Sequence, residues 1–361
     1  MEGGAAVADR MVPGETPPGT AGGYAAPAAA SVLAPPAAAE PGRAVLAALD
    51  LGTNNCRLLI ARPARGGFRV IDAFSRIVRL GEGLTRSDRL SDDAMARTVS
   101  ALKVCGSKMR RRGVTDLRAV ATEACRRAGN CGEFLERVER ETGIRIEIIT
   151  SNEEARLALA GCASLLDHRV PRAIVFDIGG GSTEIMWIEL VRGRPRLLDQ
   201  ISLPLGVVNL TERHGGDRVP PEEYRAMVDE VSAGLKDFDE RNGIARSVRN
   251  GRVQMLGTSG TVTTLAGIKL GLDRYDRSRV DGTWLGLEDA RAISGELRDL
   301  DFAGRAANPC VGRDRADLVI AGCAVLEGIW ERWPVARLRI ADRGVREGIL
   351  AELLARARRR S

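Results

Sequence analysis

Aromatic residues are scarce in this chain, at 4% of its residues, so a folded core must be built mainly from aliphatic side chains. The only two histidines, His168 and His214, argue against a histidine-based catalytic triad and against a histidine-rich metal site. The seven cysteines form no Cys-x-x-Cys pair and their number is odd, so neither a disulfide framework nor a zinc site is indicated. No apolar run reaches the roughly 20 residues that a membrane-spanning helix needs. We therefore expect a cytoplasmic protein without a membrane segment.

The length of 361 residues predicts two domains, because one hydrophobic core rarely grows beyond about 250–300 residues. Arginine supplies most of the net charge of +6, which favours a polyanionic partner but is equally explained by solubility. No aromatic residues are interleaved with the basic runs, so a specific nucleic-acid partner is not expected. A homodimer is allowed, since nothing in the sequence determines the oligomeric state.

Composition divides the chain into three parts. Residues 1–42 are rich in Ala, Pro and Gly and are predicted to form a disordered tail, without the pattern of a signal peptide. Residues 43–150 and 151–344 are predicted to form an N-terminal and a C-terminal lobe. A helix over about 345–361 can pack back on the first lobe.

The same pattern occurs once in each lobe. An apolar strand over 44–51 ends in Asp-Leu-Gly-Thr-Asn-Asn, and two more strands follow, over 56–61 and 67–73. A second apolar strand, 173–176, ends in Asp-Ile-Gly-Gly-Gly-Ser-Thr and is again followed by two strands. A repeated strand, Gly-rich turn, strand and strand unit predicts a duplicated α/β fold of two similar lobes with a cleft between them.

The two Gly-rich turns are candidates for phosphate binding. Glycine lets backbone N–H groups converge on an anion, and hydroxyl or amide side chains add donors. Asp50 and Asp177 end the strands before these turns, where they could hold Mg²⁺ against phosphate oxygens. A single such turn would be read as an ordinary hairpin, whereas two matched copies favour function. The predicted phosphate-binding residues of the turns are Gly52, Thr53, Asn54, Asn55, Gly179, Gly180, Gly181, Ser182 and Thr183.

Glu154 and Glu184 are the candidate catalytic carboxylates. Glu154 opens a helix, where it could orient or deprotonate a water, but Ser151 and Glu154 also have the spacing of a capping box. Glu184 follows the second Gly-rich turn and could share the metal or a water with Asp177, or simply face solvent. Arg126 could bind phosphate in bidentate fashion or lie on the surface.

A later segment, 257–261, connects a short strand to a helix. Gly257, Ser259 and Gly260 are candidate phosphate-binding residues because a helix N-terminus presents unpaired N–H groups. An ordinary N-cap by Ser259 or Thr261 explains this segment equally well.

Six segments in this order resemble the exopolyphosphatase/guanosine-pentaphosphate phosphatase family. The resemblance extends from about residue 45 to 350. Its motifs are Ala-Leu-Asp-Leu-Gly-Thr-Asn-Asn (48–55), Arg-Leu-Gly-Glu-Gly-Leu (79–84), Ser-Asn-Glu-Glu-Ala-Arg (151–156), Asp-Ile-Gly-Gly-Gly-Ser-Thr-Glu (177–184), Gly-Thr-Ser-Gly (257–260) and Asp-Arg-Gly-Val-Arg-Glu-Gly (342–348).

The resemblance implies an actin-like (ribonuclease H-like) fold and Mg²⁺-dependent release of a terminal phosphate by water. It implies that Glu154 is the catalytic carboxylate, Glu184 a second essential glutamate and Arg126 a phosphate-binding residue. Asp50 and Asp177 match the aspartates that hold the metal and water. This chain ends soon after the last motif, without the additional helical domain of longer members, which favours short substrates.

We therefore expect an exopolyphosphatase that prefers shorter chains. A guanosine pentaphosphate 5′-phosphohydrolase stays open, because both substrates present the same terminal anhydride. A polyphosphate- or alarmone-binding regulator without turnover is a further alternative, which the two glutamates disfavour. A kinase of the same superfamily is disfavoured by the Asn-Glu-Glu-Ala-Arg segment.

Overall fold

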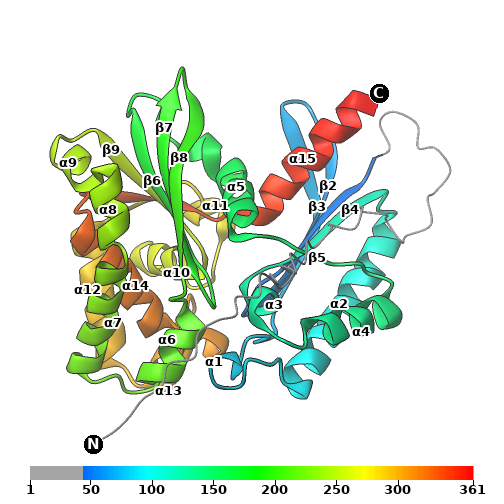
Figure 1. Ribbon diagram of the computed structural model, residues 1–361, viewed down its shortest axis with the longest axis horizontal. Coiled ribbons are helices and arrows are strands. Elements are labelled where there is room, and N and C mark those ends of the chain that lie inside the picture. The colour runs from blue at the N-terminus through cyan, green and yellow to red at the C-terminus, as the bar shows by residue number, and fades with distance from the viewer. Residues whose placement is uncertain (1–43, 361) are drawn as a thin grey trace, which may run out of the picture. The chain divides into compact units, whose positions relative to one another are not determined.

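The computed structural model describes residues 44–360, which are built around two β-sheets (Figure 1). The strand order of the first sheet is β3-β2-β1-β4-β5, and that of the second is β10-β11-β9-β6-β7-β8. In both sheets a three-stranded antiparallel unit is joined at its first strand to two parallel strands, and the second sheet adds β10 as an antiparallel edge strand. This repeated topology confirms the predicted duplicated, actin-like α/β fold. The predicted tail lies outside the described residues.

The strands of the first sheet are β1 (Leu46–Leu51), β2 (Asn55–Ala64), β3 (Gly67–Ile77), β4 (Asp116–Ala121) and β5 (Glu147–Ile148). Those of the second sheet are β6 (Arg172–Ile178), β7 (Thr183–Val191), β8 (Arg194–Leu203), β9 (Val253–Thr258), β10 (Trp284–Gly286) and β11 (Arg337–Ala341).

The helices in the first part of the chain are α1 (Leu84–Ser87), α2 (Asp92–Arg112), α3 (Glu123–Arg127), α4 (Cys131–Thr142) and α5 (Ser151–Cys162), followed by the 3₁₀-helix Ala163–Leu165. Those of the second lobe are α6 (Val207–His214), α7 (Pro221–Gly234), α8 (Lys236–Asn242), α9 (Ile244–Arg249), α10 (Gly260–Lys269), α11 (Arg277–Val280), α12 (Leu287–Asp299), α13 (Phe302–Ala307), the 3₁₀-helix Arg313–Arg315, and α14 (Val319–Arg332). The chain ends in α15 (Val345–Arg360), and within the described residues no helix is long and apolar enough to cross a membrane.

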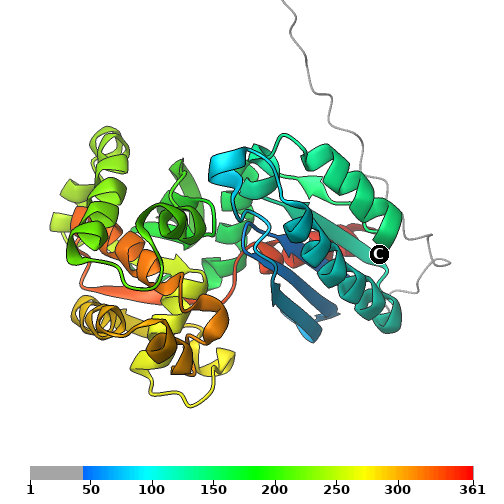
Figure 2. The ribbon, with the colours of Figure 1, turned by 90° about the horizontal axis from the view of Figure 1, so that it is seen from below.

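Each central strand is buried on both faces, which explains its nearly continuous apolar sequence. In β1, Ala47 and Leu49 point to a core with α2 and α4, whereas Leu46 and Ala48 point to a core with α5 and α15. Figure 2 shows α2 and α4 on one side of the first sheet and α15 on the other. The alternation follows from the two-residue period of a strand.

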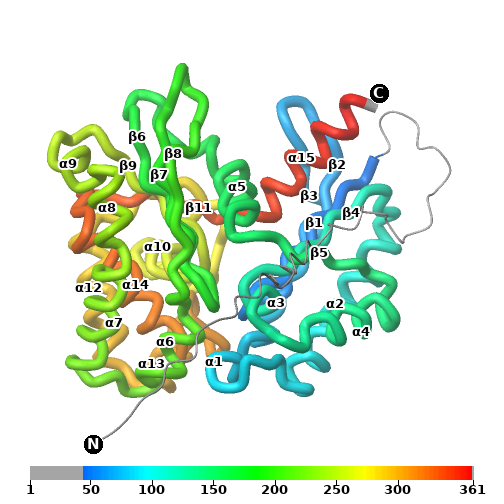
Figure 3. Tube along the Cα trace, in the orientation of Figure 1, coloured from blue at the N-terminus to red at the C-terminus, as the bar shows by residue number. Residues whose placement is uncertain are grey.

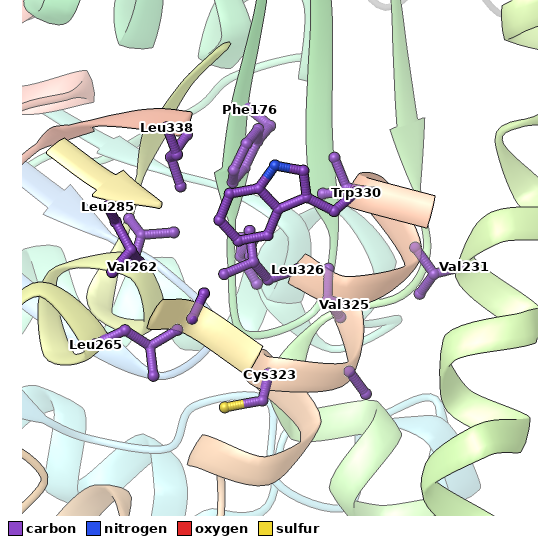
Figure 4. Packing of buried hydrophobic residues seen from close by; sticks show 14 of the residues in the cluster. Phe176, Val231, Val262, Leu265, Leu285, Cys323, Val325, Leu326, Trp330 and Leu338 are labelled. Carbon is purple, nitrogen blue, oxygen red and sulfur yellow. The ribbon is translucent and has the colours of Figure 1, made fainter. Parts of the chain in front are cut away.

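The second sheet has a larger core of its own on its outer face (Figure 4). Phe176 of β6 and Leu338 of β11 pack there beside Trp330 and Leu326 of α14. Aliphatic side chains dominate this cluster, as the low aromatic content predicts. The core therefore fixes the ends of β6, β9 and β11, where the candidate site residues lie.

Helices α5 and α15 pack against each other in the core shared by both sheets (Figure 3). Two glycines allow the close crossing: an added Cβ on Gly161 would lie 2.1 Å from the carbonyl oxygen of Gly344, and one on Gly348 would lie 2.1 Å from that of Leu157. Helix α15 also contacts β1, β2 and β3. The last helix of the chain thus holds α5, which carries Glu154, against the first sheet.

A loop over residues 78–83 connects the first turn to the second lobe. The backbone N–H groups of Arg79 and Gly81 donate to the carbonyl oxygens of Asn54 and Thr53, at 3.0 and 2.9 Å. The guanidinium of Arg79 makes a bidentate ion pair with Asp317, at 2.8 and 3.0 Å. This loop, which carries the Arg-Leu-Gly-Glu-Gly-Leu motif, therefore ties the first Gly-rich turn to the residues before α14.

Candidate active site

The two Gly-rich turns have the same internal hydrogen bond. The N–H of Gly52 donates to the carbonyl of Asn55, and the N–H of Gly179 donates to that of Ser182, both at 2.9 Å. The turns also touch: an added Cβ on Gly181 would lie 2.8 Å from Oγ1 of Thr53. Side chains larger than hydrogen at this glycine would push the turns apart. The twin hairpins thus meet, as their repetition in the sequence suggests.

A cavity of about 430 Å³ opens between these turns and the ends of the neighbouring elements. Most of the predicted site residues line it together. They are Asp50, Gly52, Thr53, Asn54, Asn55, Glu154, Asp177, Gly179, Gly180, Gly181, Ser182, Ser259 and Gly260.

Four predicted residues lie outside this lining. Thr183 is buried and donates its hydroxyl to the carbonyl of Leu205 at 2.6 Å. Gly257 is needed for packing, because an added Cβ would lie 2.6 Å from the ring of Phe176. Arg126 and Glu184 do not line the cavity themselves but hydrogen-bond to lining residues, Arg126 to Glu154 and Glu184 to Ser182.

The start of α5 differs from the capping box that the sequence allowed. Thr150 is the N-cap, and its hydroxyl accepts a hydrogen bond from the N–H of Glu153 at 3.2 Å. The carboxylate of Glu154 instead accepts from Nη1 of Arg126 at 2.8 Å and lines the cavity. Burial, and then the charge of Glu184, raise the pKa of Glu154 well above its usual range, while Arg126 opposes this increase. A carboxyl group with a raised pKa in a cavity is suited to proton transfer with water.

Glu184 is a buried residue of β7, only 2% exposed, rather than a solvent-facing one. Its carboxylate accepts hydrogen bonds from the hydroxyls of Ser182 and Ser202, at 2.6 and 3.0 Å. Burial raises the pKa of Glu184, and these hydroxyls oppose the increase. Burial followed by the charge of Glu184 raises the pKa of Asp177 to about 7. The site therefore concentrates negative charge that a cation or a proton would relieve.

The residues around Asp50 and Asp177 fit Mg²⁺. Among residues 44–360, no three histidine, cysteine, aspartate or glutamate side chains are placed around one metal position. Mg²⁺, however, is usually held by one or two carboxylates together with water and substrate phosphates. Buried oxygens of Asn54, Asn55 and Ser259 have no hydrogen-bond partner, and all three residues line the cavity. Oxygen acceptors and uncompensated carboxylates suit this ion.

Ser259 also departs from the N-cap interpretation. It precedes α10 with φ 114°, outside the usual range for a residue with a side chain, and its hydroxyl caps no N–H group. The strained backbone thus leaves this hydroxyl free of the helix and directed to the cavity lining.

The sequence reasoning missed a group of cavity-lining arginines, which are Arg57, Arg277, Arg315, Arg343 and Arg346. Burial lowers the pKa of Arg315 and of Arg346. Arg315 donates to the hydroxyl of Thr264 at 3.3 Å, and Arg277 pairs with Glu347 at 2.6 Å. Arg343 pairs with Asp281 at 2.8 Å, so the two buried guanidinium groups of Arg315 and Arg346 are the better suited to binding phosphate.

The sequence repeat could have indicated one of these arginines as a site residue. In β2, Arg57 lies opposite Asp50, and in β7, Glu184 lies opposite Asp177. Both residues follow their aspartate by the same number of positions, so the duplication that indicates Glu184 also indicates Arg57. Of the remaining arginines, Arg343 and Arg346 lie in the Asp-Arg-Gly-Val-Arg-Glu-Gly motif, whereas Arg277 and Arg315 come from two other segments that had no signal.

The duplicated two-sheet fold defines an actin-like α/β protein. The chain belongs to the Ppx/GppA phosphatase family, whose model matches residues 59–357, which confirms the resemblance seen in the sequence. A crystal structure of the Aquifex aeolicus member of this family is 30% identical, with 87% of this chain and 98% of that chain covered and a TM-score of 0.70. An exopolyphosphatase-like protein is 29% identical over 87% and 98% of the two chains, with a TM-score of 0.79. An exopolyphosphatase from Cytophaga hutchinsonii, 23% identical over 86% and 98% of the chains, shares the fold with a TM-score of 0.78.

Proposed function

We propose that this phosphatase hydrolyses the terminal phosphoanhydride of inorganic polyphosphate and prefers short chains. The observation that carries the proposal is the meeting of both Gly-rich turns and the carboxylate of Glu154 in one cavity. Basic residues that line the same cavity, including Arg57, Arg315 and Arg346, suit the further phosphates of a chain. Guanosine pentaphosphate carries the same terminal anhydride and is the alternative substrate.

The residues divide the chemistry between them. Backbone N–H groups of the two turns and the hydroxyl of Thr53 hold the terminal phosphate. Glu154 orients the attacking water and accepts its proton, while Arg126 orients Glu154. Glu184 positions the hydroxyl of Ser182. Asp50 and Asp177 would hold Mg²⁺, which when bound neutralises charge on the phosphate oxygens.

The direct test compares phosphate release from tripolyphosphate, long polyphosphate and guanosine pentaphosphate, each with and without Mg²⁺. Glu154→Gln should lower turnover of the preferred substrate by about 10²–10⁴-fold, the usual contribution of a positioned general base. Glu153→Gln is the matched control, because Glu153 lies on the same helix but pairs with Arg118 and Arg156 outside the cavity lining. Undiminished phosphate release by Glu154→Gln would refute the proposal.

Phosphate release measured together with the binding of tripolyphosphate decides between hydrolysis and a regulator that binds without turnover. Tight binding of tripolyphosphate with no phosphate release in Mg²⁺ would support the regulator. We also propose that the enzyme works in the reducing cytoplasm, which is supported by its seven cysteines, all buried and unpaired.

A further inference from the structure

The guanidinium of Arg126 is almost fully occupied by groups of the protein. Its Nη1 donates to Glu154 at 2.8 Å and to the carbonyl of Ile149 at 3.0 Å. Its Nε and Nη2 both donate to the same oxygen of Glu123, at 3.1 and 2.9 Å. Since a guanidinium has five N–H donors in a fixed fork, no bidentate edge is left for phosphate. Arg126 can therefore bind a phosphate in bidentate fashion only if a carboxylate releases it.

Glu123 is the partner of Arg126 that a phosphate could displace. Its side chain is 16% exposed and lines the substrate cavity, whereas Arg126 does not. Its Cγ lies 3.1 Å from the position that a Cβ on Gly181 would occupy, so it reaches the second Gly-rich turn. The charge of Glu123 is also close enough to contribute to the raised pKa of Glu184. A carboxylate thus stands where the terminal phosphate has to approach.

This position has two physical consequences for an anionic ligand. The ligand must replace the Glu123 carboxylate on Nε and Nη2 of Arg126, and it is repelled by the displaced charge. Both effects weaken the binding of substrate and of product phosphate. Weaker ground-state binding raises KM without lowering kcat, and it speeds the release of the product.

We infer that Glu123 is a positioning residue that occupies Arg126 in the ligand-free site, competes with phosphate for it and thereby sets the phosphate affinity of the enzyme. This inference rests on the proposed function insofar as the cavity binds the terminal phosphate. It assigns a role to a residue that neither the motifs nor the duplication indicated.

The test measures the dissociation constant of orthophosphate by isothermal titration calorimetry on the full chain in Mg²⁺. Orthophosphate is the product and is not turned over, so the result does not depend on catalysis. Glu123→Gln should bind it roughly fivefold more tightly, the factor for one unit charge a few ångströms away at water-like screening. The amide can still accept from Arg126, and KM for tripolyphosphate should fall by a similar factor while kcat does not rise.

Glu133→Gln is the matched control, since it makes the same charge change in the first turn of α4, outside the cavity lining. It should leave the dissociation constant unchanged. In an Arg126→Gln background, the effect of Glu123→Gln should shrink to less than about twofold, because the competition is removed. If Glu123→Gln does not fold, Glu123→Ser tests the same loss of charge.

Unchanged or weaker phosphate binding by Glu123→Gln would overturn the inference, as would an equal change in Glu133→Gln or the absence of phosphate binding by the wild type. The proposed function fails separately, when Glu154→Gln still releases phosphate. Tighter phosphate binding by Glu123→Gln together with active Glu154→Gln would retain the role of Glu123 and reject that of Glu154.

Discussion

Replacement of Gly348 by alanine should separate helices α5 and α15 and thereby disturb the active site. The added Cβ would lie 2.1 Å from the carbonyl oxygen of Leu157, whereas real Cβ atoms essentially never approach within 3.0 Å, so the helices must move apart by about 0.9 Å. The obstacle is backbone, which cannot rotate away as a side chain can. Because α5 carries Glu154, the shift should reach the cavity.

The expected cost follows from two opposing effects. Forcing an extra carbon into a packed interface costs typically about 1–3 kcal/mol. Alanine is favoured over glycine in a helix by about 1 kcal/mol, which offsets part of this cost. We expect the free energy of unfolding to fall by about 0–2 kcal/mol. Phosphate release should fall by about 10-fold or more, since displacements near 1 Å can cost 10²-fold in rate.

Gly295→Ala is the matched control within this chain. Gly295 lies inside helix α12, and no heavy atom lies within 4 Å of the Cβ that alanine would add. This substitution should stabilise the protein by about 0.5–1 kcal/mol and leave activity unchanged. Urea denaturation gives the free energy of unfolding of both variants. A Gly348→Ala protein as stable and as active as the wild type would refute the reasoning about the helix crossing.

Three further predictions follow from charges at the site and between the lobes. Because burial and the charge of Glu184 raise the pKa of Asp177 to about 7, the folded protein keeps a proton that the unfolded chain, with its ordinary pKa of 3.8, releases. The free energy of unfolding in EDTA should therefore fall by about 1.4 kcal/mol per pH unit between about pH 4 and 7, and Asp177→Asn should reduce this slope in urea titrations. Asp317→Asn removes a partly exposed ion pair with Arg79 and should change the free energy of unfolding by only about 0–1 kcal/mol. It should nevertheless lower kcat/KM, because the loop over 78–83 loses its anchor. Glu139→Gln breaks an exposed pair with Arg145, and an equal loss of kcat/KM in that variant would contradict the role of Asp317. EDTA should stop phosphate release. Asp50→Asn should raise the Mg²⁺ concentration that gives half the maximal rate by about tenfold or more. An unchanged Mg²⁺ concentration at half-maximal rate would exclude Asp50 as a ligand.

Much of the fold could be predicted from local patterns. The strands β1, β2, β6 and β7 show as apolar runs before and after Gly-rich turns, because a strand buried on both faces needs apolar residues throughout. Strand β5 covers only Glu147 and Ile148, because it pairs with β4 through two residues at the sheet edge, and two residues are too few for a strand pattern to show. Helix α3 has five residues, too few for a helical period to show.

By itself the sequence determined that two Asp and Gly turns form matched hairpins and that Glu154 opens a helix, because turn chemistry and helix starts depend on neighbouring residues. Only the tertiary structure decided that Glu154 pairs with Arg126 rather than capping its helix, and that arginines from distant segments line the same cavity. These relations join residues far apart in the chain through packing of both sheets against α5 and α15. Spacing along the chain carries no information about such contacts, since they depend on how the buried surfaces fit together in three dimensions.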